Sequence, residues 1–599
     1  MKQKNNVIVL LIDSIFSECL GDRKTAISAT PFIDSLKENA IFAPNLYSYG
    51  PFTDVASKAL YCSTKPLDSY GYYFGLNSTE NNHFKLFKEN GYKTVGLYYP
   101  YYLLGSEIEK HIDHPIYTGG FKYSSVWGGK LEYYAKKKAK GELSDKEYAL
   151  MEECMELVFG CWISFYNDIE SKKCSGQIVT RFKTRDADYN GKEHLLKQYD
   201  EFRQEPKKYI DGLLEKGMDH PIAQINEYDF GTNDNIEFIK SVFENNKAFF
   251  KEANKTNFRR NLFNTDFSIK EFFKNIFGYA TGRDRDQLRY IVNYGMLLRY
   301  GSLMKKRALK SGWQNIASLN SQITALLNTI DSDNESKPFY ASLHTLEPHH
   351  NISFFSFDSF DGELVKEELE YLSPLVKECG KKFSGNLMYM LSLRYVDFYV
   401  KKLYSELEKR GILDNTTIVL VSDHGTSYFS SPVRNSVVNT FYKENYNIPL
   451  LIWGKNIDKD LIGQYNGLYS SDDVMPTLCD VLRIERPSSF SGVSLLEDSG
   501  RKWVISEYMG GGVPDMLERE VWLCIRNGKY SVAYKNSIAK EFDVDKPFCV
   551  FDLEKDKLER HNLAGKTKDD DMLVAMKKAV NERCVEIQKE TTAFLKKQL

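Results

Sequence analysis

Three side chains that commonly bind metal ions follow two apolar runs that lie far apart in the sequence. Asp13 comes directly after residues 7–12, and Asp423 and His424 come just after residues 418–421. Uninterrupted apolar runs of this length predict buried strands of a parallel sheet. Ligands of open α/β sheets bind at the carboxyl ends of the strands, so we expect Asp13, Asp423 and His424 to meet there and to bind a divalent cation.

Thr53 is the candidate nucleophile. Gly50 and Pro51 interrupt regular structure and residues 54–60 favour a helix, which places Thr53 at the predicted N-cap. Backbone N–H groups and the helix dipole favour negative charge at that position, although a threonine there is ordinarily only a cap. A cation held by the two aspartates and the histidine could also bind the Thr53 oxygen and lower its pKa, which would turn the hydroxyl into a nucleophile.

A group of histidines follows a third apolar run. His344, His349 and His350 lie just beyond the predicted strand at residues 339–343, and we expect them in a loop at the same sheet edge. Imidazoles there could hold ester oxygens, bind a second metal or protonate a leaving oxygen. A surface loop that happens to carry histidines is the alternative interpretation.

The order of the predicted elements indicates an α/β protein with a mixed, mostly parallel sheet flanked by helices. Residues 1–120 alternate between strand and helix patterns, residues 121–334 have helical periodicity, and strand patterns return in residues 335–500. Short strands and a charged final helix follow in residues 501–599. We therefore predict a discontinuous catalytic domain (1–120 and 335–500), a helical insertion (121–334) and a small α+β C-terminal subdomain (501–599).

The composition is that of a globular protein of several folding units, with 599 residues of which 42% are hydrophobic and 27% charged. A formal charge of -2 gives no reason to expect nucleic acid as a partner. The first apolar run is too short for a signal peptide, and no stretch approaches the roughly 18 apolar residues of a membrane span. The ten cysteines lack paired spacing, so we expect reduced thiols and a cytoplasmic protein.

Several short motifs occur in a specific order along the chain. They are residues 12–13, 30–36, 89–94, 410–416, 422–425 (Ser-Asp-His-Gly), 448–450, 473–478, 492–495, 551–553 and 562–564. Together they resemble the sulfatase-like branch of the alkaline phosphatase/sulfatase superfamily, which also contains phosphoethanolamine and phosphoglycerol transferases. The resemblance implies an alkaline-phosphatase-like fold and a metal-dependent hydrolase or transferase.

The resemblance also implies roles for individual residues. Asp13, Asp423 and His424 would bind the metal, Thr53 would be both ligand and nucleophile, and His344 and His349 would assist at the substrate or leaving group. Zinc or manganese suits such a donor set best, with calcium or magnesium as alternatives, because imidazole is a poor ligand for hard cations.

The chain departs from the sulfatase pattern at two positions. Sulfatases carry a second aspartate directly after the first, and this chain has Ser14 at that position. The nucleophile of sulfatases is a modified cysteine or serine, and this chain has Thr53 at the matching position. Threonine cannot form the aldehyde that sulfatases use, because its β-carbon carries a methyl group. Cys62 is a rival nucleophile, but it lacks the proline and arginine of the sulfatase motif and would lie deep in the predicted helix.

These residues lead to three functional hypotheses. The first is an enzyme that acts on small-molecule or glycan phosphate esters or phosphodiesters, glycan- or glycerol-linked, through a covalent phosphothreonine. The second is a sulfuric ester hydrolase on the same scaffold. The third is a catalytically silent relative that binds a glycan or protein, an idea that Ser14 supports. Hydrolysis, transfer and the oligomeric state all stay open at this point.

Overall fold

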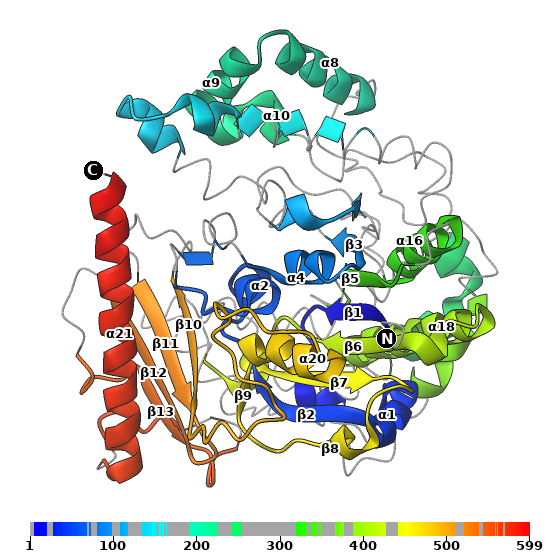
Figure 1. The fold of residues 1–599 in the computed structure, drawn as a ribbon, viewed down its shortest axis with the longest axis vertical. Coiled ribbons are helices and arrows are strands. Elements are labelled where there is room, and N and C mark those ends of the chain that lie inside the picture. Colours follow the sequence, from blue (N-terminus) through cyan, green and yellow to red (C-terminus); the bar gives the residue numbers. More distant parts are fainter. Residues whose placement is uncertain are drawn as a thin grey trace.

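The apolar run that precedes Asp13 forms strand β1 (Asn6–Ile12), which lies inside the larger of two β-sheets in this computed structural model (Figure 1). Every residue of β1 is buried, as expected for a strand that helices cover on both faces. β1 pairs in parallel with β5 (Phe339–Thr345) on one side and with β6 (Thr416–Val421) on the other. Segments that are distant in the sequence therefore end at one sheet edge.

The structure describes most of the predicted catalytic domain and C-terminal subdomain. The described residues are 5–20, 28–68, 71–72, 79, 81–98, 108–117, 319–333, 337–345, 347–348, 366–367, 369–376, 387–426, 441–509, 520–537, 543–557, 559, 561–566 and 569–598, together with parts of 134–255.

Within those residues the larger sheet has nine strands in the order β4-β3-β5-β1-β6-β7-β2-β8, with β9 also beside β2. The remaining strands are β2 (Ala40–Tyr47), β3 (Lys93–Tyr98), β4 (His114–Tyr117), β7 (Asn447–Trp453), β8 (Gly463–Gln464) and β9 (Tyr469–Ser470). β7 runs antiparallel to both β6 and β2, and the other pairings are parallel. The predicted mixed, mostly parallel sheet is confirmed.

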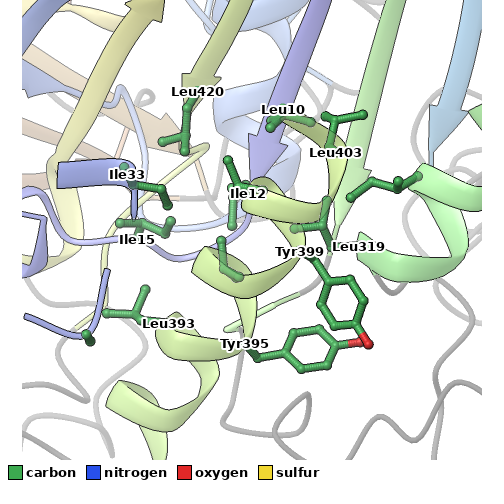
Figure 2. Close-up of a cluster of buried hydrophobic side chains, with 14 of the residues drawn as sticks. Leu10, Ile12, Ile15, Ile33, Leu319, Leu393, Tyr395, Tyr399, Leu403 and Leu420 are labelled. Carbon is green, nitrogen blue, oxygen red and sulfur yellow. The ribbon is translucent and has the colours of Figure 1, made fainter. Parts of the chain in front are cut away.

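Helices cover both faces of this sheet because β1 sends alternate apolar side chains to opposite sides. Leu10 and Ile12 pack with α1 (Pro31–Leu36), α16 (Leu319–Ser332) and α18 (Leu387–Lys409), as Figure 2 shows for part of this core. Val9 and Leu11 pack on the opposite face. The helices there are α2 (Thr53–Cys62), α4 (His83–Glu89) and α20 (Val474–Leu482).

The C-terminal part contains a second, smaller sheet and a long final helix, which agrees with the predicted α+β pattern, and the boundary at residue 501 stays a prediction. Its antiparallel sheet has the order β10-β11-β12-β13, and the last helix, α21 (Asp571–Gln598), lies along it (Figure 1). The strands are β10 (Val504–Met509), β11 (Glu520–Arg526), β12 (Tyr530–Ser537) and β13 (Cys549–Asp552). Leu573, Met576 and Val580 recur at helical spacing on α21 and are buried in the same core as the sheet.

The parts of residues 121–334 that the structure describes are helical and include α8 (Gly191–Gln204), α9 (Pro206–Lys216) and α10 (Pro221–Gln224). These three helices lie together at the top of Figure 1, away from the larger sheet. The boundaries of the insertion stay a prediction. None of the described helices combines the length and the apolarity needed to cross a lipid bilayer.

Candidate metal and nucleophile site

The parallel strands β1, β5 and β6 bring the predicted site residues to one edge. β1 is paired with β6 through Leu11 and Val421, so Asp13 and the Ser422–His424 segment leave the sheet side by side. β5 is paired with β1 so that His344 lies opposite Leu11. The fourth component comes from helix α2, whose first residue is Thr53.

Four of these residues form one buried cluster. The ligand atoms of Asp13, Asp423 and His424 lie within 4.8 Å of one another. His424 Nε2 is 3.4 Å from Asp13 Oδ1 and 3.6 Å from Asp423 Oδ2. The Thr53 hydroxyl donates a hydrogen bond of 2.7 Å to Asp423 Oδ2. None of the four side chains is more than slightly exposed.

Backbone and hydroxyl groups fix the orientation of Asp423. Its Oδ1 accepts hydrogen bonds from the backbone N–H groups of Ser14 (3.1 Å) and His424 (2.7 Å), which leaves Oδ2 for Thr53. The Ser14 hydroxyl donates to Asp13 Oδ1. Ser14 thus supports both carboxylates from the position where sulfatases carry their second aspartate, and it does so with a left-handed backbone (φ 63°).

A backbone contact orients the ring of His424. Nδ1 lies 2.7 Å from the carbonyl oxygen of Gly425. A carbonyl oxygen can only accept, so Nδ1 is the donor of this bond, and Nε2 is the ring nitrogen that faces the carboxylates. Metal-bound histidines are commonly oriented by such a bond to a backbone carbonyl.

The electrostatics of the cluster favour a bound cation. Burial raises the pKa of Asp13 well above its usual range, and the neighbouring charge of Asp423 raises it further. Two buried carboxylates that face one imidazole are costly unless a positive charge balances them. A divalent cation held by Asp13, Asp423 and His424 would supply that charge, and the oxygen and nitrogen donors suit zinc or manganese.

The structure corrects the predicted position of Thr53. We expected Thr53 at the N-cap of its helix, but the N-cap is Phe52 and Thr53 is the first helical residue. Its hydroxyl donates a hydrogen bond to Asp423, at the end of a different element. The residue is therefore oriented by the strand end of β6 and not by its own helix.

A second correction concerns His344, which we expected in a loop. β5 continues through Thr345, because pairing with β1 extends that far, so His344 lies within the strand. Its Nε2 is 3.9 Å from Asp423 Oδ2, and the side chain is buried. Burial lowers the pKa of His344 to about 4, so its imidazole is neutral at neutral pH.

The other two candidates have different outcomes. His349 lies outside the described residues, so its role stays a prediction. Cys62 is the last residue of α2, about 13 Å along the helix axis from Thr53 at 1.5 Å per residue. Burial raises the pKa of the Cys62 thiol to about 12, which disfavours the thiolate that a cysteine nucleophile requires.

Glu347 is a site residue that the sequence analysis missed. Its side chain is buried, and its negative charge is one of those that raise the pKa of Asp13. Glu347 Oε2 accepts hydrogen bonds from the Thr345 hydroxyl and from the backbone N–H of Leu319 (3.2 Å). The signal was present in the sequence, because Glu347 lies between the histidines at 344 and 349, but its carboxylate was not considered.

The fold and the site define an α/β protein with a candidate metal site at the carboxyl ends of its parallel strands. Residues 225–484 match the Sulfatase family model. This match covers less than half of the chain, and it is to the family that the ordered motifs resemble. The matched range includes His344, Asp423 and His424 but not Asp13 or Thr53.

The known proteins that are similar to the chain share limited identity with it. Arylsulfatase K of Bos taurus is 27% identical over 222 residues, which cover 33% of this chain and 38% of that protein. A solved 2-O GAG sulfatase is 12% identical, with a TM-score of 0.48 and coverage of 99% and 94%. The phosphonate monoester hydrolase of Agrobacterium radiobacter is also 12% identical, with a TM-score of 0.46 and coverage of 98% and 97%. The chain spans less than half the length of the arylsulfatase K that it matches.

Proposed function

We propose that this protein cleaves phosphate esters or phosphodiesters, with Thr53 as the nucleophile and a divalent cation, zinc or manganese, held by Asp13, Asp423 and His424. The observation that carries the proposal is the 2.7 Å hydrogen bond from the Thr53 hydroxyl to Asp423, a member of the candidate metal site. A hydroxyl used only as a helix cap would have bonded to its own helix instead.

The residues suggest the following first step. A cation in this site would lower the pKa of the Thr53 hydroxyl and draw charge from the non-bridging oxygens of the substrate. Asp423 Oδ2 accepts the hydrogen bond of that hydroxyl and is placed to accept its proton. The Thr53 oxygen forms a bond to phosphorus as the bond from phosphorus to the leaving oxygen breaks. We propose His349 as proton donor to the leaving oxygen, and His344 as a neutral hydrogen-bonding partner for the ester.

The second step regenerates the enzyme. Water or an acceptor hydroxyl attacks phosphorus in the phosphothreonine, and the Thr53 oxygen leaves and takes up a proton. Attack by water gives a hydrolase, whereas attack by a sugar or glycerol hydroxyl gives a transferase. Both outcomes use the same residues, so we propose the reaction class without choosing the acceptor.

The identity of residue 53 supports phosphorus over sulfur as the atom attacked. The aldehyde route of sulfatases releases sulfate by elimination from the carbon that carries it, and a threonine cannot follow that route. A threonine ester must be resolved by a second attack on the central atom. Displacements of this kind at phosphorus are assisted chiefly by positioning and charge stabilisation, which a cation beside Thr53 would provide.

A sulfuric ester hydrolase is the second candidate, and the comparisons favour it over the first. The family model that matches is Sulfatase, and arylsulfatase K is among the relatives in sequence. In that case Thr53 would be sulfated and then released by attack of water on sulfur. The substrate in either case would be a small molecule or a glycan ester.

We propose that the reaction takes place in the cytoplasm. The cysteines that the structure describes are buried thiols and not disulfides, as is usual in a reducing compartment. Fractionation of the native host cells, with antibody detection of the untagged protein, tests this proposal, and recovery from the medium or cell envelope would overturn it.

Paired substrates test the proposed reaction. The purified protein would be incubated with Mn²⁺ or Zn²⁺ and matched aryl phosphate, phosphodiester and sulfate esters. We expect phosphodiester or phosphate turnover that Thr53→Ala abolishes and that Thr329→Ala preserves, because the Thr329 hydroxyl bonds only within α16. Sulfate release that depends on Thr53 would establish the second candidate. Metal binding without turnover of any ester would favour a silent, glycan- or protein-binding relative.

A further inference from the structure

Arg526 and Glu559 form a buried ion pair in the C-terminal subdomain. Arg526 Nη2 lies 2.8 Å from Glu559 Oε1, and the two side chains are only 1% and 2% exposed. Arg526 is the last residue of β11, and Glu559 follows β13. Buried ion pairs contribute little to stability compared with well-packed apolar side chains of similar volume.

Both partners bind the backbone of one segment of the catalytic domain. We call residues 441–446, which include the helix α19 (Lys443–Tyr446), the clamped segment. Arg526 Nη2 donates a hydrogen bond of 2.6 Å to the carbonyl oxygen of Phe441. Glu559 Oε2 accepts a hydrogen bond from the backbone N–H of Lys443. The ion pair therefore bonds to the backbone of the segment at two points: Arg526 donates to a carbonyl oxygen and Glu559 accepts from an N–H group.

The clamped segment lies against the metal-ligand loop. The backbone N–H of Gly425 donates a 2.9 Å hydrogen bond to the carbonyl oxygen of Asn445. A Cβ atom at Gly425 would lie 2.0 Å from the carbonyl oxygen of Glu444, so the two backbones touch. The carbonyl oxygen of Gly425 in turn orients the ring of His424. A shift of the clamped segment would therefore move Gly425, and through Gly425 it would change the orientation of the His424 imidazole.

The same segment also supports the chain that leads to the nucleophile. The backbone N–H of Ser48 donates a 2.7 Å hydrogen bond to the carbonyl oxygen of Tyr446. From the other side, the Ser506 hydroxyl on β10 donates to the carbonyl oxygen of Ser48 at 2.8 Å. Ser48 lies five residues before Thr53. The C-terminal subdomain therefore contacts both the chain that leads to Thr53 and the segment that packs against His424 and Gly425.

We propose that Arg526 and Glu559 are positioning residues that hold the clamped segment against His424 and Gly425, so that the C-terminal subdomain sets the geometry of the candidate metal site. The inference rests on the metal site of the proposed function. It adds to that function a pair of residues which touch neither metal nor substrate.

The experiment compares two buried arginines of the same subdomain. Arg526→Met removes the clamp, whereas Arg583→Met removes a guanidinium that pairs with Glu507 and does not contact the clamped segment. The affinity for Mn²⁺ would be measured by isothermal titration calorimetry for both variants and the parent protein. We expect Arg526→Met to weaken Mn²⁺ binding by about 10- to 100-fold, the range typical of residues that orient metal ligands. Arg583→Met should leave the Mn²⁺ affinity unchanged.

A second readout needs no metal. Hydrogen exchange of the Gly425 and Ser48 amides in the metal-free protein should accelerate in Arg526→Met relative to the core amides of β1. In Arg583→Met it should accelerate only as much as those core amides do, because only Arg526 bonds to the segment that carries the acceptors. Arg526→Lys, which keeps a donor and the charge, should recover part of the Mn²⁺ affinity. If Arg526→Met does not fold, Glu559→Gln gives the same comparison, because it removes the charge that orients Arg526.

The outcomes separate this inference from the proposed function. Equal Mn²⁺ affinity in Arg526→Met and Arg583→Met, or equal exchange at Gly425, would overturn the positioning role even if esters are cleaved. A selective loss of Mn²⁺ affinity in Arg526→Met would support it even if no ester is turned over, in which case the proposed function alone would fail.

Discussion

Replacing Arg583 with methionine should destabilise the protein strongly, because Arg583 joins α21 to the rest of the molecule through buried charges. Its Nε and Nη2 donate to the two oxygens of Glu507 at 2.6 and 2.7 Å, and Nη2 also donates to Asp68 at 2.7 Å. Arg583 is 5% exposed and Glu507 is fully buried. Removal of one partner leaves the other charge buried and uncompensated, which typically costs about 3–5 kcal/mol of folding free energy.

Arg410→Met is the matched control. Arg410 also makes a fork of hydrogen bonds, to Asp331 and Glu406 at 2.7–2.8 Å, but its partner Asp331 is 51% exposed. Solvent screens that pair, so we expect an unfolding free energy close to that of the parent protein. Urea denaturation followed by tryptophan fluorescence measures both variants. A loss in Arg583→Met no larger than in Arg410→Met would refute the reasoning.

The difference in unfolding free energy between the parent protein and Arg583→Met should depend on pH. Burial raises the pKa of Glu507, but the charge and hydrogen bonds of Arg583 outweigh it and hold the pKa below the ordinary value of 4.5. The stabilisation that the Arg583–Glu507 pair provides is therefore complete above pH 4.5, the ordinary pKa. It is lost as the pH falls through the lower pKa of Glu507 in the folded state. The advantage of the parent protein over Arg583→Met should be largest near neutral pH and shrink below about pH 4.5.

Three further predictions concern the metal site and the helix that carries Thr53. Asp423→Asn should abolish Mn²⁺ binding measured by calorimetry while the protein stays folded by circular dichroism, because the change removes charge but keeps shape. Addition of Mn²⁺ or Zn²⁺ at about 100 times its Kd should stabilise the chelator-treated protein by about 2.7 kcal/mol, visible as a higher Tm, and an unchanged Tm would count against a site in the folded state. Burial lowers the pKa of Lys58 from 10.5 to about 8, so between these pH values the unfolded chain binds more protons than the folded protein. The stability of the parent protein relative to Lys58→Met should therefore rise with pH in that range. Urea denaturation at pH 7 to 10 measures this slope, and parallel curves would contradict the assignment.

The central part of the fold could be predicted from the sequence because it depends on a simple pattern. β1 and β6 are apolar runs, and such runs in an α/β chain become adjacent buried parallel strands. Once they are adjacent, Asp13 and Asp423 must leave the sheet at the same edge. Helix α18 can also be read from the sequence, because its apolar residues recur at helical spacing and it ends just before Gly411, which has the left-handed φ of 68° typical of a helix end.

Other parts of the fold depend on tertiary contacts that no local pattern reveals. β2 was not predicted because Pro44 and Asn45 interrupt its apolar residues, and the structure shows a register shift between Ala43 and Leu46 at that point. β13 was not predicted as a strand, because a strand of four residues is too short to show a clear alternation of apolar and polar residues. Pairing with a neighbouring strand, and not propensity, makes both segments extended.

The candidate site was predicted in composition but not in detail. Residue types and spacing identified Asp13, Thr53, Asp423 and His424, which the structure brings together. The supporting contacts could not be foreseen, because each joins backbone groups of segments that are distant in sequence. The contact of Gly425 with Asn445 and the grip of Arg526 on Phe441 are of this kind.

Covalent trapping at Thr53 tests the central proposal most directly. The protein with Mn²⁺ would be mixed with a slowly hydrolysed phosphodiester as the sole ester, quenched in acid, and analysed by intact mass and peptide mapping. We expect one added phosphoryl group, which keeps the alcohol of the diester that did not leave, on the peptide that contains Thr53, and no adduct in Thr53→Val. Turnover that persists in Thr53→Val, or an adduct on another residue such as Cys62, would contradict the account.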